Sequence, residues 1–199
     1  MTARTDHEWK PQALAIISLF GLIAVVMRLL PPEMRVWWNI TPIGGLAVFA
    51  GARLRLGYAL LVPVLVMAVC DTLFYATKGW YPSPYSYLGF AAYVVLGYLL
   101  ARKSASLVKP AVAGLTGYVL FFFITNTGAW IEPALPEYAP QTWQTLLLSY
   151  RKGLEFMTAQ DYGVAKMLAQ VGLDVITAVG LVALHARLAR QYNPAELPA

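Results

Sequence analysis

The chain has 199 residues, of which 59% are hydrophobic and only 13% are charged, and its formal net charge is +5. Soluble domains carry about 25% charged residues, so this chain has too few to cover a water-facing surface, and we predict an integral membrane protein. The positive charge does not indicate nucleic-acid binding, because Lys and Arg lie mostly at the ends of apolar runs, as they do beside membrane spans.

Six apolar runs lie along the chain, and a span needs about 20 mostly apolar residues. We predict transmembrane helices over about residues 11–30, 40–53, 56–75, 85–101, 110–130 and 164–189. The second run is short and glycine-rich, so a broken or re-entrant segment is an alternative there. The prediction is a compact all-α bundle of about six transmembrane helices, with one domain over residues 1–192 and a frayed tail at 193–199.

The first run resembles a signal peptide in following a charged start. A signal peptide has an apolar stretch of about 7–15 residues that ends in small residues. This run is longer and ends in Arg28-Leu29-Leu30-Pro31-Pro32. We therefore expect a retained helix.

The distribution of Lys and Arg predicts the orientation of the bundle. With the N-terminus inside, nine of the fifteen Lys and Arg fall on the inner side and six on the outer side. Arg28 and Lys166 count among the outer six. We therefore expect both termini in the cytoplasm.

The predicted outer loops are rich in aromatic residues. Residues 141–157 carry apolar side chains at helical spacing, which predicts a short amphipathic helix at the outer surface. Tyr138, Trp143 and Tyr150 lie in and beside this segment. They are candidates for a lid over an outward-facing pocket, and the alternative is an interfacial aromatic belt.

Polar residues inside spans are costly and are therefore candidates for function. Alternating topology places those of four predicted helices at a similar depth in the outer half of the membrane. The candidate ligand-binding residues are Asn39, Thr41, Asp71, Asn126, Trp130 and Asp174. The alternative is that these polar groups satisfy one another and only fix helix packing.

Small residues in the second predicted helix form another candidate surface. Ala47 and Gly51 are a small-x-x-x-small pair, which lets helices approach closely in lipid. The pair either packs inside the bundle or docks a partner membrane protein.

The sequence contains no recognisable catalytic or metal-binding motif. The single cysteine, Cys70, excludes an intrachain disulfide and a cysteine metal cluster, and the carboxylates do not have ligand spacing. We expect no metal, no cofactor and no enzymatic activity.

Several motifs of this chain resemble those of an uncharacterised family of bacterial six-helix membrane proteins, a domain of unknown function. The similarity covers about residues 36–184. It includes the run from Asn39-Ile40-Thr41-Pro42 to Gly51-Ala52, Pro63, Cys70-Asp71, Thr125-Asn126, Trp130, Tyr138-x-Pro140-x-Thr142, Tyr150 and Gly172-Leu173-Asp174. The chain departs from the family at Cys70, where serine is common, and by Leu173 before Asp174.

That family is in turn similar to the substrate-binding S components of energy-coupling-factor transporters. This second resemblance implies a six-helix protein that captures a small molecule in an outward-facing pocket. The resemblances therefore imply a multi-pass protein of the lipid bilayer of a bacterial inner membrane that binds an unknown small molecule during uptake, with or without a partner transporter. The alternative is a non-catalytic accessory subunit that packs against other membrane protein subunits.

Overall fold

The computed structural model describes residues 11–30, 40–102, 104, 106–158 and 163–192, and every regular element in these ranges is helical. The elements are α1 (Pro11–Leu29), α2 (Ile43–Arg53), α3 (Leu56–Lys78), α4 (Pro84–Leu96), its π-helical continuation η2 (Gly97–Ala101), α5 (Val108–Ile131), the 3₁₀ turn η3 (Pro136–Tyr138), α6 (Trp143–Thr158) and α7 (Val164–Tyr192). The prediction of an all-α chain is therefore confirmed.

Among the described residues, five helices are long and apolar enough to cross a membrane: α1, α3, α4 with η2, α5, and α7 as far as Ala189. The second predicted span differs from the expectation. α2 has only 11 residues and is about 16 Å long at 1.5 Å per residue, roughly half of a hydrocarbon core.

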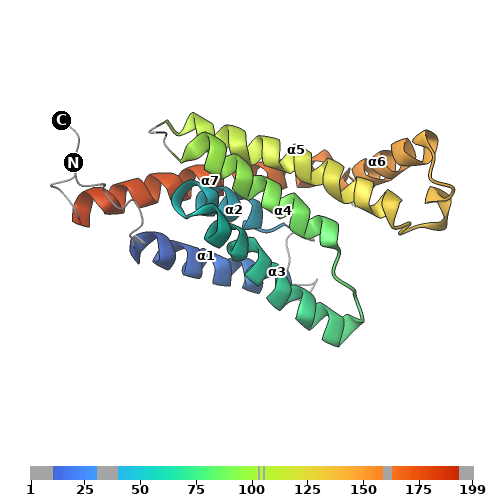
Figure 1. Cartoon of the computed structure of the whole chain (residues 1–199), viewed down its shortest axis with the longest axis horizontal. Coiled ribbons are helices and arrows are strands. Elements are labelled where there is room, and N and C mark those ends of the chain that lie inside the picture. Colours follow the sequence, from blue (N-terminus) through green and yellow to red (C-terminus); the bar gives the residue numbers. More distant parts are fainter. Residues whose placement is uncertain (1–10, 31–39, 103, 105, 159–162, 193–199) are drawn as a thin grey trace.

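The long helices run roughly side by side (Figure 1). The start of α1 and the end of α7 lie at the same end of the bundle, on the left of the figure, which we call the terminal end. The connection from α3 to α4 lies at the opposite, distal end. α6 extends from the distal end back along α5, so it packs on the bundle as a hairpin with that helix.

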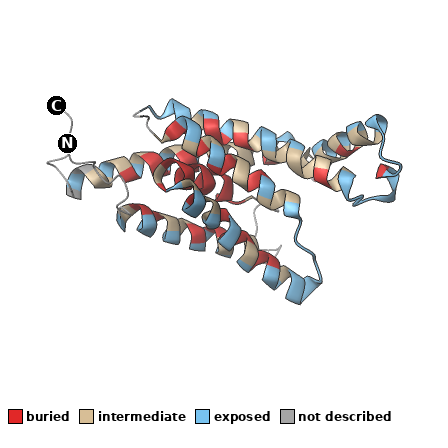
Figure 2. Cartoon of the chain, in the orientation of Figure 1, coloured by how far each residue is buried: buried red, intermediate tan, exposed pale blue. Residues whose placement is uncertain are grey.

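α2 is the centre of the bundle. All ten residues from Ile43 to Ala52 are buried, and Figure 2 shows the buried residues concentrated around this helix. Glycines allow the close packing: a Cβ on Gly51 would clash with the carbonyl oxygen of Val94, and a Cβ on Gly97 with that of Val48. α2 and the α4–η2 helix are therefore in backbone contact.

This packing decides between the two roles considered for Ala47 and Gly51. Ala47 has no exposed surface, and Gly51 is buried against α4. The small pair thus packs inside the bundle, and it offers no face on which a partner protein could dock.

The outer surface of the long helices is apolar. Leu19 and Leu22 of α1 and Leu61 and Leu65 of α3 are exposed by between 49% and 62%. Such a surface is unfavourable in water and suits a hydrocarbon solvent. The structure thus agrees with a membrane protein.

Candidate functional site

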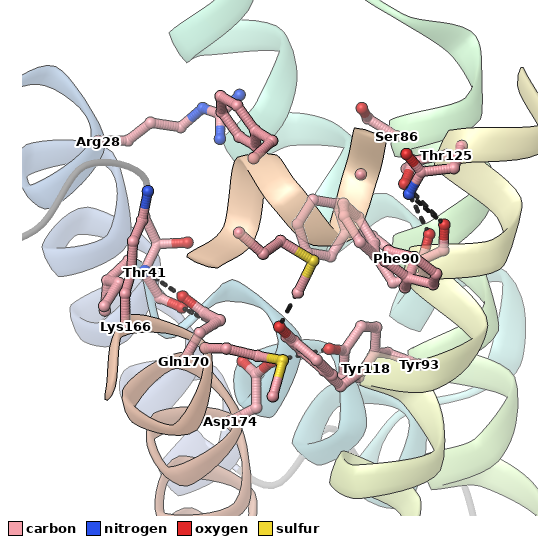
Figure 3. Close-up of a pocket in the computed structure, with 18 of the residues that line it drawn as sticks. Arg28, Thr41, Ser86, Phe90, Tyr93, Tyr118, Thr125, Lys166, Gln170 and Asp174 are labelled. Carbon is pink, nitrogen blue, oxygen red and sulfur yellow. Dashed lines mark hydrogen bonds between the residues drawn. The ribbon is translucent and has the colours of Figure 1, made fainter. Parts of the chain in front are cut away.

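A cavity of about 320 Å³ lies inside the bundle, between the start of α7 and the helices α4 and α5 (Figure 3). This volume is at the lower end of the range for ligand pockets, about 300–1,000 Å³. Side chains from α1 and α3 to α7, and the residues just before α2, form its lining. They are Arg28, Ile40, Thr41, Met67, Ser86, Phe90, Tyr93, Tyr118, Phe121, Phe122, Thr125, Asn126, Gly153, Phe156, Met157, Lys166, Met167, Gln170 and Asp174.

Asp174 lies at one end of the cavity and is 1% exposed. Its Oδ2 accepts a hydrogen bond from the Tyr93 hydroxyl at 2.7 Å, and its Oδ1 accepts one from the backbone N–H of Gly45 at 3.2 Å. The first N–H groups of a helix have no partner within the helix, and Pro42, at the cap position of α2, supplies no side-chain bond. Asp174 therefore caps α2 from a neighbouring helix.

Gln170 attaches the start of α2 to α7 one turn further along the cavity. The backbone N–H of Thr41 donates to Oε1 of Gln170, and Nε2 of Gln170 donates to the carbonyl of Thr41, both at 3.0 Å. A glutamine amide bonded in this way satisfies both backbone groups of one residue. The start of α2 is thus fixed to α7 by two side chains on one helical face.

Lys166 is the third polar residue on this face of α7, and it is only 8% exposed. Its Nζ lies 5.3 Å from the ring centre of Phe156, and within the described ranges no carboxylate oxygen lies within ion-pair distance of it. An ammonium group held away from water without a carboxylate partner is costly. Lys166 is therefore a candidate for ligand recognition.

Arg28 brings a second cation to the cavity, on the same side as Lys166 in Figure 3. Its guanidinium lies 3.6 Å from Oδ1 of Asp71 and over the ring of Phe74. Oδ2 of Asp71 accepts a hydrogen bond from Tyr87 at 2.9 Å. Asp71 therefore neutralises Arg28 from outside the cavity lining.

Aromatic and methionine side chains form most of the remaining wall. Phe90 and Phe121 pack with ring centres 4.8 Å apart, and the Tyr118 hydroxyl approaches the sulfur of Met157 at 3.9 Å. Apolar walls with a few placed polar groups are typical of small-molecule sites. The arrangement suits binding of a compact molecule with apolar and polar parts.

The predicted ligand-binding residues divide into three groups. Thr41, Asn126 and Asp174 line the cavity. Asp71 lies behind Arg28, and Trp130 is turned to α6, where its Nε1–H donates to Thr145 Oγ1 at 3.0 Å. Asn39 lies outside the described residues.

The predicted lid residues do not reach the cavity, although α6 does. Trp143 is 67% exposed, and Tyr138 is buried in its own loop, where burial raises the pKa of its hydroxyl. Tyr150 is hydrogen-bonded to Thr127 at 2.8 Å. α6 covers the cavity instead through Gly153, Phe156 and Met157, the following turns of the same helix.

Sequence reasoning missed the two cations and most of the wall. Arg28 and Lys166 are at the ends of apolar runs, a position typical of membrane flanks. One signal was available for Lys166: it stands four residues before Gln170 and eight before Asp174, which places all three on one helical face. Nothing in the sequence shows that this face lines a cavity.

A family model matches residues 9–192, nearly the whole chain, and its description is a family of unknown function, DUF6580. The chain belongs to the DUF6580 family. No curated protein and no solved structure shows a match to it. The predicted membership of an uncharacterised family is thus confirmed, and the function of this DUF6580 protein has to be inferred from its own cavity.

Proposed function

We propose that this DUF6580 protein is a small-molecule-binding protein of the bacterial inner membrane that takes part in uptake, alone or with a partner transporter. In this proposal its role is similar to that of S components, and both termini lie in the cytoplasm. The cavity then opens toward the distal, extracytoplasmic side.

The observation that carries the proposal is the cavity itself. Six helices and the segment before α2 contribute to one space of about 320 Å³, which is within the range of small-molecule pockets. Lys166 lies in its lining, is largely buried as a residue, and has no carboxylate partner among the described residues. A bound small molecule with a polar or charged group would fill the space and pair with this side chain.

The experiment is native mass spectrometry of the full chain extracted gently from its own membranes. Ser86 lines the cavity, whereas Ser83, three residues earlier, is exposed and outside it. Ser86→Phe fills the space, and Ser83→Phe is a matched control with the same change of volume.

We expect a reproducible extra mass of small-molecule size on the wild type and on Ser83→Phe, and its loss from Ser86→Phe. An extra mass that persists in Ser86→Phe would place the ligand elsewhere. A stable assembly with other chains and no small ligand would overturn the proposal in favour of an accessory subunit.

A further inference from the structure

Lys166 is the charged residue of the cavity lining for which the described bundle supplies no carboxylate partner. Asp174 and Gln170 have hydrogen-bond partners on α2 and α4. Arg28 has Asp71. As a whole residue Lys166 is 8% exposed, and in the described part of the chain its ammonium lies over the ring of Phe156 and has no carboxylate within ion-pair distance.

The backbone around Lys166 adds to the positive potential. Lys166 is the third residue of α7, a helix of 29 residues. The first N–H groups of a long helix lack intrahelical partners, and the helix dipole places partial positive charge there. A buried lysine at this position is therefore a site suited to an anion.

The charges near the cavity indicate how many negative charges the ligand carries. Arg28 is paired with Asp71, so their charges offset one another. Asp174 is bound by Tyr93 and Gly45 at the other end of the face, about 12 Å from Lys166 at 1.5 Å per residue. Among the described residues, Lys166 is the cation that has no carboxylate partner at its end of the cavity. Phe156 lies beside it, and Phe90 and Phe122 contribute further apolar wall to the same cavity.

We propose that the cavity recognises a compact amphiphilic anion. Its carboxylate or phosphate pairs with Lys166 beside Arg28, and its apolar body lies among Phe90, Phe122 and Phe156. This inference rests on the proposed function, since it names the ligand class of the same cavity. The anionic group belongs either to a water-soluble molecule or to a lipid headgroup.

The test uses the full chain in nanodiscs of phosphatidylcholine, which carry no anionic lipid. The probes are matched pairs: octanoate against octanamide, and 3-phenylpropionate against 3-phenylpropanamide, with phenyl phosphate as the phosphate probe. Binding is read by calorimetry and by the shift in unfolding temperature. A second set of nanodiscs contains phosphatidylglycerol, and its retention after extraction is measured.

We expect the acids or the phosphate to bind and the amides to bind much more weakly. Lys166→Met should weaken anion binding about 10- to 100-fold, as expected for one hydrogen bond to a charged group. Lys166→Arg should retain most of the affinity. Lys152→Met, the same change at a partly exposed lysine of α6 that pairs with Glu137 and lies outside the cavity, should bind like the wild type.

Lys166→Met also tests whether the lysine stabilises the folded protein. It removes a buried charge without a carboxylate partner, so its unfolding temperature without probe should equal or exceed that of the wild type. A large fall would overturn the inference, because it would make Lys166 a structural residue.

The remaining outcomes separate this inference from the proposed function. Two results would overturn the anionic ligand class and leave the proposed small-molecule binding intact. One is equal binding of acids and amides. The other is unchanged binding by Lys166→Met while Ser86→Phe loses its ligand. Retention of phosphatidylglycerol alone, lost in Lys166→Met, supports the anion and overturns uptake of a soluble molecule. Binding of no acid, phosphate or anionic lipid overturns the inference.

Discussion

The carboxylate of Asp174 on α7 caps α2: its Oδ1 accepts the backbone N–H of Gly45, 129 positions earlier in the chain. The same carboxylate accepts the hydroxyl of Tyr93 on α4. One side chain therefore joins three helices at the end of the cavity. The sequence allows either ligand binding or helix packing for Asp174, and these hydrogen bonds are the ones that helix packing requires.

Removing this carboxylate should destabilise the bundle. Asp174→Ala leaves the N–H of Gly45 and the hydroxyl of Tyr93 without their acceptor, and we expect the free energy of unfolding to fall by about 2–4 kcal/mol. Asp174→Asn keeps an acceptor oxygen and should cost about 1 kcal/mol. Denaturant unfolding of the detergent-solubilised chain measures both. Equal losses for the two variants would contradict the capping role.

Two glycines in the first turn of α2, Gly44 and Gly45, should tolerate no side chain. A Cβ on Gly44 would lie 2.5 Å from Oδ1 of Asp174, and one on Gly45 would lie 2.5 Å from the carbonyl oxygen of Asp174. Gly44→Ala and Gly45→Ala should each cost about 1–3 kcal/mol, the usual range for overpacking.

The control for these glycines lies on α7. Gly180 has no atom within 4 Å of an added Cβ. Gly180→Ala should therefore be neutral or stabilise the protein by up to about 1 kcal/mol through helix propensity. If all three substitutions have the same thermal unfolding midpoint, α2 and α7 do not pack as closely as described.

Two of the side-chain hydrogen bonds between α5 and α6 can be removed by single substitutions. Trp130 donates to Thr145 at 3.0 Å, and Tyr150 is bonded to Thr127 at 2.8 Å. Trp130→Phe and Tyr150→Phe should each cost about 1 kcal/mol, and the loss should be local to α6. Hydrogen exchange should become faster in α6 and stay unchanged in α2. Trp143→Phe, at a site 67% exposed, should leave both helices unaffected.

The orientation of the bundle can be tested by cysteine labelling. Cys70 is buried, and Cys70→Ser gives a background without thiols. Tyr81, at the distal end, is 81% exposed, and Val108, where α5 begins, is 67% exposed. In intact cells a membrane-impermeant maleimide should label Tyr81→Cys, and it should label Val108→Cys only after permeabilisation. The reverse pattern would mean that the cavity faces the cytoplasm.

The long helices were predictable because their signal is local. A run of about 20 consecutive apolar residues is typical of a membrane-spanning helix. The predicted ranges 56–75, 110–130 and 164–189 accordingly correspond to α3 (Leu56–Lys78), α5 (Val108–Ile131) and α7 (Val164–Tyr192). Depth along alternating spans places Thr41, Asn126 and Asp174 at a similar level, and all three line one cavity in the structure.

The cations and the cover of the cavity were not predictable in this way. A lysine at the end of an apolar run is normally at the membrane interface, and Lys166 is buried only because α6 folds back along α5 and covers the start of α7. That packing depends on contacts between α5 and α6 such as Trp130 with Thr145. Periodicity showed the amphipathic helix but not the surface against which it packs.

The most direct measurement is an experimental density map of the wild-type chain, purified gently in nanodiscs, at a resolution that shows side chains. The account predicts density between Lys166 and Asp174 that no protein atom explains, with one end at the ammonium of Lys166. A cavity closed by Phe90, Phe156 and Met157, with Lys166 turned out toward the membrane surface, would contradict it.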